Sequence, residues 1–255
     1  MLRVEGAGAS DKGIRERNED AFRELPDARF WVIADGMGGY QGGQVASLVT
    51  VETLADFYAR NASDRDLTWP FAIDAALDLP SNQALVGVRL AHAAVQARKR
   101  GPLREMGSTV AAISFHGEHA IVVHAGDSRV YRLRGGTLTH LTRDHSLVEE
   151  MRAAAETRDD FTPAQIHAME MQYGHVITRA VGIGAAIEPT VSRFAVESGD
   201  TFVLTTDGVH GVLGDDEIRD AILELSPRVA AECLVARALE AGSRDNATAV
   251  VVRAS

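Results

Sequence analysis

Aspartates beside apolar, β-branched segments are the residues of this sequence whose types and places most suggest chemistry. They are Asp35, Asp127, Asp207 and Asp245, and glycine adjoins the first three. A single aspartate in such a place usually shapes a turn by bonding to its own backbone. Four are harder to explain in that way, because carboxylates at neighbouring strand ends repel each other unless a positive charge lies between them.

A cluster of this kind has the ligand chemistry of a hard divalent cation. Carboxylate sets without histidine suit Mg2+, Mn2+ or Ca2+ better than zinc. Three or four carboxylates can hold two ions about 3.5–4 Å apart, a spacing that activates a bridging water against a phosphate ester. The run "FWVIADGMGGYQGG" (30–43) brings Asp35 to a glycine-rich loop, whose backbone carbonyls could join the ligands.

Spacing excludes two other uses of this glycine-rich run. A dinucleotide-binding fingerprint that starts with Gly36 and Gly38 requires a third glycine where Gln41 stands. A phosphate-binding Walker loop from Gly38 to Gly43 requires lysine and then serine or threonine, whereas glutamine and valine follow.

The elements that must position the aspartates are predicted as short strands with helices between them. Strands are expected at 30–35, 110–115, 120–126, 129–133, 200–206 and 247–253, with tight turns at 116–119 and 134–136. Helical spacing of apolar residues runs from Leu48 to Tyr58 and from Leu85 to Val95, and capping residues mark further helix starts at Ser146, Thr162 and Ser226. Strands in tight pairs favour antiparallel pairing. We therefore predict an α+β fold, in which two antiparallel sheets stack face to face with helices outside.

Composition excludes several classes of protein. The 255 residues are 45% hydrophobic and carry a formal net charge of −10, which argues against nucleic-acid binding. No apolar run approaches the roughly 20 residues of a membrane span, and the first residues lack the apolar core of a signal peptide. We expect a cytoplasmic protein without membrane contact. Cys233 is the only cysteine, so neither a disulfide framework nor a zinc cluster of cysteines is possible.

A series of motifs in one order carries a family resemblance. They are "GIRERNEDAF" (13–22), "ADGMGG" (34–39), "GSTV" (107–110), "AGDSRVY" (125–131), "TTDGV" (205–209) and "RDNATAVVV" (244–252). They span nearly the whole chain and resemble the PP2C/PPM family of metal-dependent protein Ser/Thr phosphatases, particularly its compact bacterial members. The resemblance implies a four-layer α-β-β-α sandwich. It also implies a single phosphatase domain over 1–255, with a flap subdomain at about 143–174.

The same resemblance implies a centre of two Mn2+ or Mg2+ ions. Asp35 would bridge the ions, and Gly36 would add its carbonyl oxygen. Asp207 and Asp245 would hold the first ion, and Asp20 would anchor the waters of the second, with Glu19 as a weaker candidate. Asp127 matches a residue that binds a weaker third ion in bacterial relatives; its alternative role is to shape a tight turn together with Ser128.

Arg15 lies five positions before Asp20 and matches the family's phosphate-gripping arginine, a task that suits a guanidinium fork. The resemblance implies that a hydroxide bridging two metal ions attacks phosphorus, while Arg15 and the ions neutralise the phosphate oxygens. Arg15 and Asp35 are therefore the candidate catalytic residues, and Arg15 also the candidate substrate-binding residue. Met37 stands where animal members carry a histidine proposed as general acid, so we assign no acid.

The expected substrates are phosphoserine and phosphothreonine proteins, including those modified by a bacterial Hanks-type Ser/Thr kinase, and we expect a monomer. Two alternatives remain. A catalytically dead binding module of the same fold would be expected to lose metal carboxylates, and all the expected ones are present. A metal-dependent nuclease could use similar carboxylates, but the acidic net charge argues against it.

Overall fold

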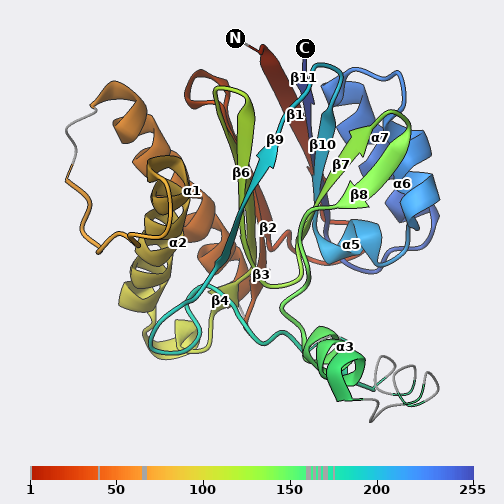
Figure 1. Ribbon diagram of the computed structural model, residues 1–255. Coiled ribbons are helices and arrows are strands. Elements are labelled where there is room, and N and C mark those ends of the chain that lie inside the picture. The colour runs from red at the N-terminus through yellow and green to blue at the C-terminus, as the bar shows by residue number, and fades with distance from the viewer. Residues whose placement is uncertain are drawn as a thin grey trace.

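The structure of the protein, a computed structural model, describes residues 2–39, 41–64, 68–158, 162, 165, 168, 172–174 and 176–255. Its strands form two sheets that stack face to face, and helices cover the outer sides of both (Figure 1). Among the described residues, no helix combines the length and the apolarity needed to span a membrane. The predicted α+β sandwich is confirmed.

All strand pairs within the two sheets are antiparallel. The first sheet has the order β1 (Val4–Asp11), β11 (Ala247–Ala254), β10 (Thr201–Thr205), β7 (Arg129–Arg134) and β8 (Thr137–His140). The second has the order β2 (Asp20–Leu25), β3 (Phe30–Met37), β5 (Val110–His116), β6 (His119–Ala125) and β9 (Thr190–Ala195), and the short β4 (Gly107–Ser108) pairs with β3.

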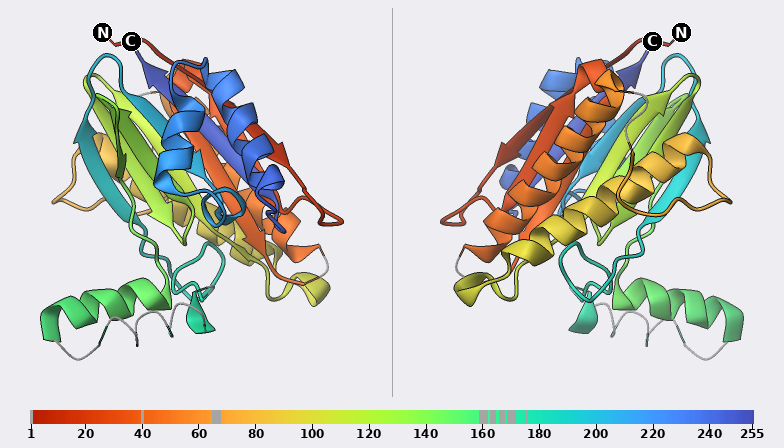
Figure 2. Two further views of the ribbon diagram at one scale, coloured as in Figure 1. Left: turned by 90° about the vertical axis from the view of Figure 1, so that its right-hand side faces the viewer. Right: turned by 90° about the vertical axis from the view of Figure 1, so that its left-hand side faces the viewer.

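The helices belong to three groups, which the two side views separate (Figure 2). Against the second sheet lie α1 (Gly42–Ser63) and α2 (Leu79–Arg98); against the first lie α5 (Asp207–His210), α6 (Asp215–Ile222) and α7 (Pro227–Glu240). A further helix, α3 (Leu147–Arg158), projects from one end of the sandwich. Short 3-10 turns lie at Pro26–Ala28 and Gly101–Leu103.

Strand β3 shows why its sequence is apolar almost without interruption. Successive side chains of a strand point to opposite faces of the sheet. Trp31 and Ile33 enter the core between the sheets, whereas Phe30 and Val32 pack in the core beneath α1 and α2. Both faces of β3 are therefore buried, and the strand carries Asp35 into the interior on a rigid element.

The predicted strands form, with bounds that shift by one or two residues at most ends. The turns at 116–119 and 134–136 connect paired strands, as expected. Strand β3 continues to Met37, so Asp35 lies inside the strand and not at its end. The helix starts after Ser146 and Ser226 are confirmed, but most of the helix expected after Thr162 lies outside the described residues. Strands β1, β2, β4, β8 and β9 were not predicted.

A buried ion pair ties the ends of β7 and β10 together. Arg134 donates two hydrogen bonds of 2.6 Å, from Nε and Nη2, to the carboxylate of Asp200. Asp200 is fully buried, and the side chain of Arg134 is 30% exposed. Arg134 also donates to Glu197, which is 65% exposed. One arginine thus joins a buried carboxylate and a solvated one.

These two carboxylates should differ strongly in their contribution to stability. Asp200→Ala leaves a largely buried guanidinium without its bidentate partner and should lower the free energy of unfolding by about 3 kcal/mol. Glu197→Ala, the matched control, should cost less than about 1 kcal/mol because its ion pair is exposed. Urea unfolding of both variants checks this; equal losses would contradict the assignment of Asp200 as the buried anchor.

Candidate metal centre

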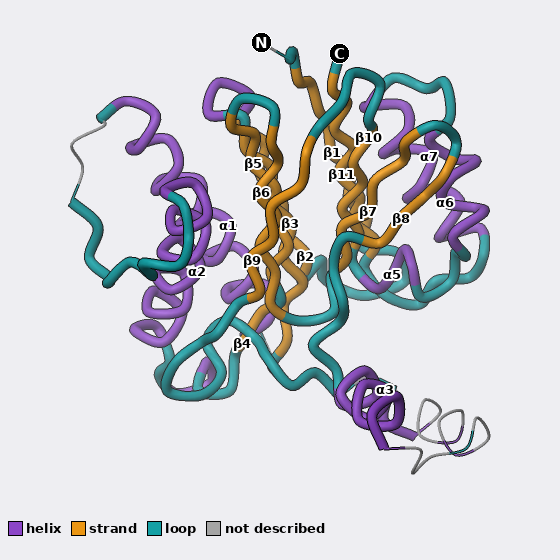
Figure 3. The backbone as a smooth tube through the Cα atoms, in the orientation of Figure 1, coloured by secondary structure: helices purple, strands orange, loops and turns teal. Residues whose placement is uncertain are grey.

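The predicted metal ligands come from both sheets and meet at one end of the sandwich. Asp20, the first residue of β2, lies directly opposite Asp35 in the antiparallel register with β3. Asp207 begins α5 just after β10, and Asp245 stands just before β11. Asp127 lies in the connection between β6 and β7, which crosses from one sheet to the other at the same end as α5 (Figure 3).

Burial and mutual repulsion raise the pKa values of these carboxyl groups. The pKa of Asp20 is raised to about 7, mainly by burial, although hydrogen bonds from Thr248 and Thr206 oppose the shift. Burial raises the pKa of Asp35 well above its usual range, and Asp20, Asp207 and Asp127 raise it further by repulsion. Each negative charge makes the next one costlier, so the cluster favours either protons or a cation.

The same two causes act on the other side of the cluster. Burial and repulsion by Asp207 raise the pKa of Asp127 to about 7. Burial and repulsion by Asp245 raise the pKa of Asp207, whose side chain hydrogen-bonds that of Asp35. This contact raises the pKa of Asp35 and lowers that of Asp207.

The donor set fits divalent cations of the Mg2+ and Mn2+ type. Oδ1 of Asp20 and Oδ1 of Asp207 are buried and accept no hydrogen bond. A buried polar atom without a partner is costly, and a hard cation takes oxygen ligands of this type. These two orphaned oxygens are the local evidence that the cluster is built for a charge it can share.

The described side chains are not yet arranged as a finished ligand shell. Among them, no group of three or more His, Cys, Asp or Glu residues is placed to hold a metal ion. Two of the carboxylates already have partners within the protein. Arg15 Nη2 donates to Asp245 Oδ2 over 2.7 Å, and Thr206 and Thr248 donate to Asp20 Oδ2 over 2.9 and 2.6 Å. A cation bound by Asp245 must compete with Arg15.

Glycine is required at position 36 because two backbone segments press against it. A Cβ there would lie 2.0 Å from the carbonyl oxygen of Gly43 and 2.7 Å from that of Glu19. Gly36 N also donates to Glu19 O over 3.0 Å. The backbone beside Asp35 is therefore held against both α1 and the start of β2, which leaves no room for a side chain.

Four of the five predicted aspartates border a cavity of about 350 Å³ at this end of the sandwich, whereas Asp20 does not line it. It is lined by Arg15, Glu19, Asp35, Gly36, Met37, Thr109, Asp127, Ile177, Asp207, Asp245 and Asn246. A neighbouring cavity of about 470 Å³ shares Arg15, Glu19, Asp245 and Asn246 and adds Glu16 and Arg17. The side chain of Arg15 is 55% exposed, so a ligand in the first cavity can reach its guanidinium.

Hydroxyl groups that sequence analysis did not single out support the cluster. Thr109 Oγ1 accepts from the backbone N of Asp35 over 2.9 Å and lies 2.7 Å from Ser128 Oγ. Ser108 Oγ donates to the carbonyl oxygen of Asp35 over 3.0 Å. The "GSTV" motif contains both residues, but only the folded chain shows that they fix the backbone of Asp35.

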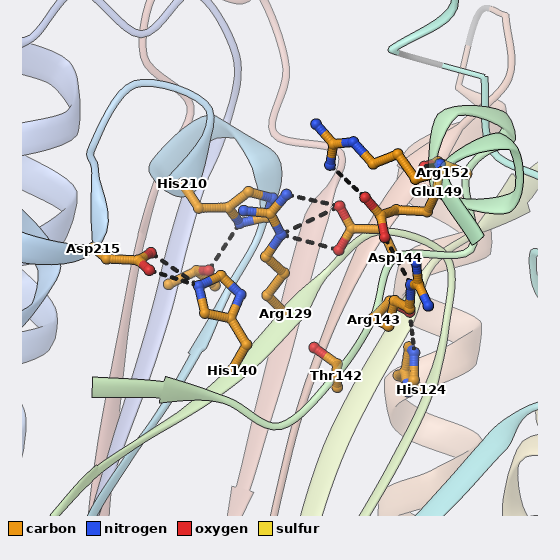
Figure 4. Close-up of polar contacts among 12 residues, drawn as sticks. His124, Arg129, His140, Thr142, Arg143, Asp144, Glu149, Arg152, His210 and Asp215 are labelled. Carbon is orange, nitrogen blue, oxygen red and sulfur yellow. Dashed lines mark hydrogen bonds and ion pairs between the residues drawn. The ribbon is translucent and has the colours of Figure 1, made fainter. Parts of the chain in front are cut away.

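A bidentate ion pair anchors the connection that carries Asp127. Arg129 Nε and Nη2 donate to the carboxylate of Asp144 over 2.9 and 2.7 Å, and Figure 4 shows the two groups facing each other. Asp144 lies in the segment between β8 and α3. The segment that leads into α3 is thus joined to the turn beside the carboxylate cluster.

The raised pKa values predict how the metal-free protein responds to pH. The pKa of Asp127 is about 7 in the folded chain, against a reference value of 3.8. Protonation of Asp127 therefore stabilises the fold: this contribution is complete below pH 3.8 and is lost as pH rises through 7. In chelator, Asp127→Asn should therefore raise Tm at pH 8 and flatten the fall in Tm between pH 5 and pH 8.

Asp78 supplies a control of opposite sign, because a hydrogen bond with Ser81 lowers its pKa. Asp78→Asn should lower Tm at pH 8. Thermal melts of both variants at pH 5 and pH 8 test this account. An Asp127→Asn protein that melts below the wild type at pH 8 would contradict it.

Comparisons with known proteins give the geometry a family context. The model of the protein phosphatase 2C family matches residues 6–241. The Ser/Thr protein phosphatase PstP of Mycobacterium tuberculosis is 34% identical over 96% of this chain, which spans 44% of the length of PstP. Protein phosphatase PhpP of Streptococcus pneumoniae is 31% identical over 87% of this chain and 84% of its own.

Solved structures agree. The catalytic domain of PstP, in complex with two manganese ions, matches all of this chain and 99% of its own with a TM-score of 0.79 and 31% identity. A family model that covers most of the sequence and this structural match lead to one conclusion: the chain belongs to the protein phosphatase 2C family.

Proposed function

We propose that this chain hydrolyses phosphoserine and phosphothreonine esters of proteins with the help of two Mn2+ or Mg2+ ions. One observation carries the proposal: Asp207, which has a buried oxygen without a hydrogen-bond partner, lines the same cavity as Asp35 and the exposed Arg15. A phosphate monoester needs both partners, because its oxygens require a cation and its phosphorus an activated water. The manganese complex of PstP supports the choice of metal.

In this proposal Asp35 would hold both ions, and the Gly36 carbonyl would be a further ligand. Asp207 and Asp245 would hold the first ion, and Asp20 would anchor the waters of the second. When bound, the ions supply an activated water and neutralise phosphate charge. Arg15 binds the phosphate oxygens with its fork of donors once it leaves Asp245. Its present partner is a carboxylate, whose geometry resembles that of a phosphate edge.

The proposal extends to the domain, the oligomeric state, the compartment and the substrate proteins. We propose a single catalytic domain over 1–255, a monomer acting in the cytoplasm on proteins phosphorylated by a Hanks-type kinase. A flap at about 143–174 would border the site; part of that segment lies outside the described residues. The relatives named Ser/Thr phosphatases support the substrate class.

An assay of two substrates tests the proposed activity. The purified chain should hydrolyse p-nitrophenyl phosphate and a phosphothreonine peptide with Mn2+ present, and lose both activities in excess chelator. Readdition of Mn2+ should restore them. Activity that persists after chelation, or no hydrolysis of either substrate with Mn2+ or Mg2+, would refute the proposal.

Asp35→Asn should abolish this activity, because it removes the charge proposed to bridge the two ions. We expect turnover at saturating Mn2+ to fall by at least about 100-fold, the loss typical of removing one preorganised electrostatic group. Asp216→Asn is the matched control: its carboxylate pairs with Arg219 on the surface of α6. Near-wild-type turnover of Asp35→Asn would contradict the proposed bridge.

We further propose that Asp127 binds a weaker third ion. Asp127 and Asp207 line the same cavity, and repulsion by Asp207 helps to raise the pKa of Asp127. Asp127→Ala should lower kcat and remove a weak Mn2+ phase in calorimetry, while two tighter ions remain. A lower Tm with normal metal-saturated turnover would instead assign Asp127 to the turn that it forms with Ser128.

A further inference from the structure

A buried carboxamide joins the two segments that meet beside the cavity. Asn246 follows Asp245 and is only 4% exposed. It lines both cavities that Arg15 lines. An amide carries two N–H donors and one acceptor oxygen, so a buried one must find several partners.

Every hydrogen of this amide is used on one loop. Asn246 Nδ2 donates to the carbonyl oxygens of Lys12 and Arg17, both over 2.9 Å. Its Oδ1 accepts from the backbone N of Glu19 over 2.7 Å. The side chain thus holds both ends of the loop 12–17 and the residue that leads into β2.

Arg15 lies at the tip of the loop that this amide closes. Its backbone N donates to Lys12 O over 3.2 Å, the same carbonyl that Asn246 binds. Its guanidinium Nε donates to Arg244 O over 2.9 Å. The direction of the Arg15 side chain therefore depends on where the loop sits relative to 244–246, and the amide of Asn246 sets that distance.

The same amide connects the loop to the metal cluster. Glu19, whose N–H binds Asn246, accepts a hydrogen bond from Gly36 N through its own carbonyl. Two successive hydrogen bonds thus connect the Asn246 side chain through the backbone of Glu19 to Gly36, the residue beside Asp35. Asn246 therefore fixes the position of the Arg15 loop relative to the carboxylate cluster.

We propose that Asn246 is a positioning residue: it fixes the loop 12–17 so that Arg15 is preorganised to bind the substrate phosphate. This inference rests on the proposed phosphatase function and adds a residue to it. Asparagine suits the task because it donates to two carbonyls while it accepts from an N–H. Aspartate, of equal size, has no donors and would face two carbonyl oxygens and the charge of Asp245.

A double-mutant cycle tests whether Asn246 acts through Arg15. Arg15→Ala, Asn246→Ala and the double variant are compared at saturating Mn2+ by KM for a phosphothreonine peptide and by the inhibition constant of inorganic phosphate. Each single change should raise both values by about 10- to 100-fold, the effect of one charge-assisted contact. The double variant should have the same KM and inhibition constant as Arg15→Ala alone, because Asn246 can no longer act through Arg15 once that side chain is removed.

Asn82 offers a matched control, since it is an equally buried amide that fixes another loop. It is 2% exposed, and its Nδ2 donates to Asp74 O and Leu77 O over 2.9 Å each. Asn82→Ala should lower Tm without changing the phosphate inhibition constant. Additive effects in the cycle, or an Asn246→Ala protein with wild-type phosphate affinity, would overturn the proposal.

A second variant keeps the test decisive if Asn246→Ala does not fold. Asn246→Ser retains a shorter polar group, and hydrogen exchange of the peptide 12–19 should be faster in it, because Glu19 loses its acceptor. Unchanged exchange in a folded Asn246→Ser protein would overturn the proposal. A wild type inactive with Mn2+ would refute the function instead, and exchange would still report on the loop.

Discussion

Buried negative charge without enough positive charge is the constraint on which the rest of this structure depends. Asp20, Asp35, Asp127 and Asp207 have raised pKa values because they are taken out of water and repel one another. Two of their oxygens accept no hydrogen bond. Such a cluster destabilises the metal-free fold, and the cations proposed to bind there would offset that cost.

The architecture holds this cluster in place from several sides. Strands β2 and β3 bring one pair of aspartates together by register, and β10 and β11 bring the other pair from the facing sheet. Close backbone contacts at Gly36 exclude side chains there, while Thr109 fixes the backbone N of Asp35. Arg15 supplies the cationic partner of Asp245 in the metal-free arrangement. In the proposed function, a cation bound by Asp245 would release Arg15 to bind phosphate.

The strands that could be predicted from sequence include those whose two faces are both buried. The strands 30–37 and 247–254 are apolar and β-branched because both faces are buried. Strand β1, "VEGAGASD", was missed because glycine and polar residues weaken its pattern. A Cβ at Gly6 or Gly8 would lie 2.6 Å from Trp31 or Phe22 of the facing sheet. Tertiary packing requires glycine at these positions, and a local sequence pattern does not reveal such packing.

The site residues likewise divide into those that local sequence patterns could select and those that they could not. Asp35, Asp127, Asp207 and Asp245 could be selected from their places beside predicted strands, whereas Arg15 and Asp20 were found only through the family resemblance. The role of Asn246 could not be predicted, because its partners lie more than 200 positions away in the chain. The pairing of Arg15 with Asp245 was likewise invisible, since it depends on the loop 12–17 folding back onto the start of β11.

Anomalous diffraction from crystals soaked in Mn2+ tests the central claim most directly. The account predicts two strong manganese peaks in the cavity, roughly 3.5–4 Å apart, with Asp35 between them and Arg15 released from Asp245. A single peak distant from Asp35, or no manganese in the cavity while Arg15 still binds Asp245, would contradict it.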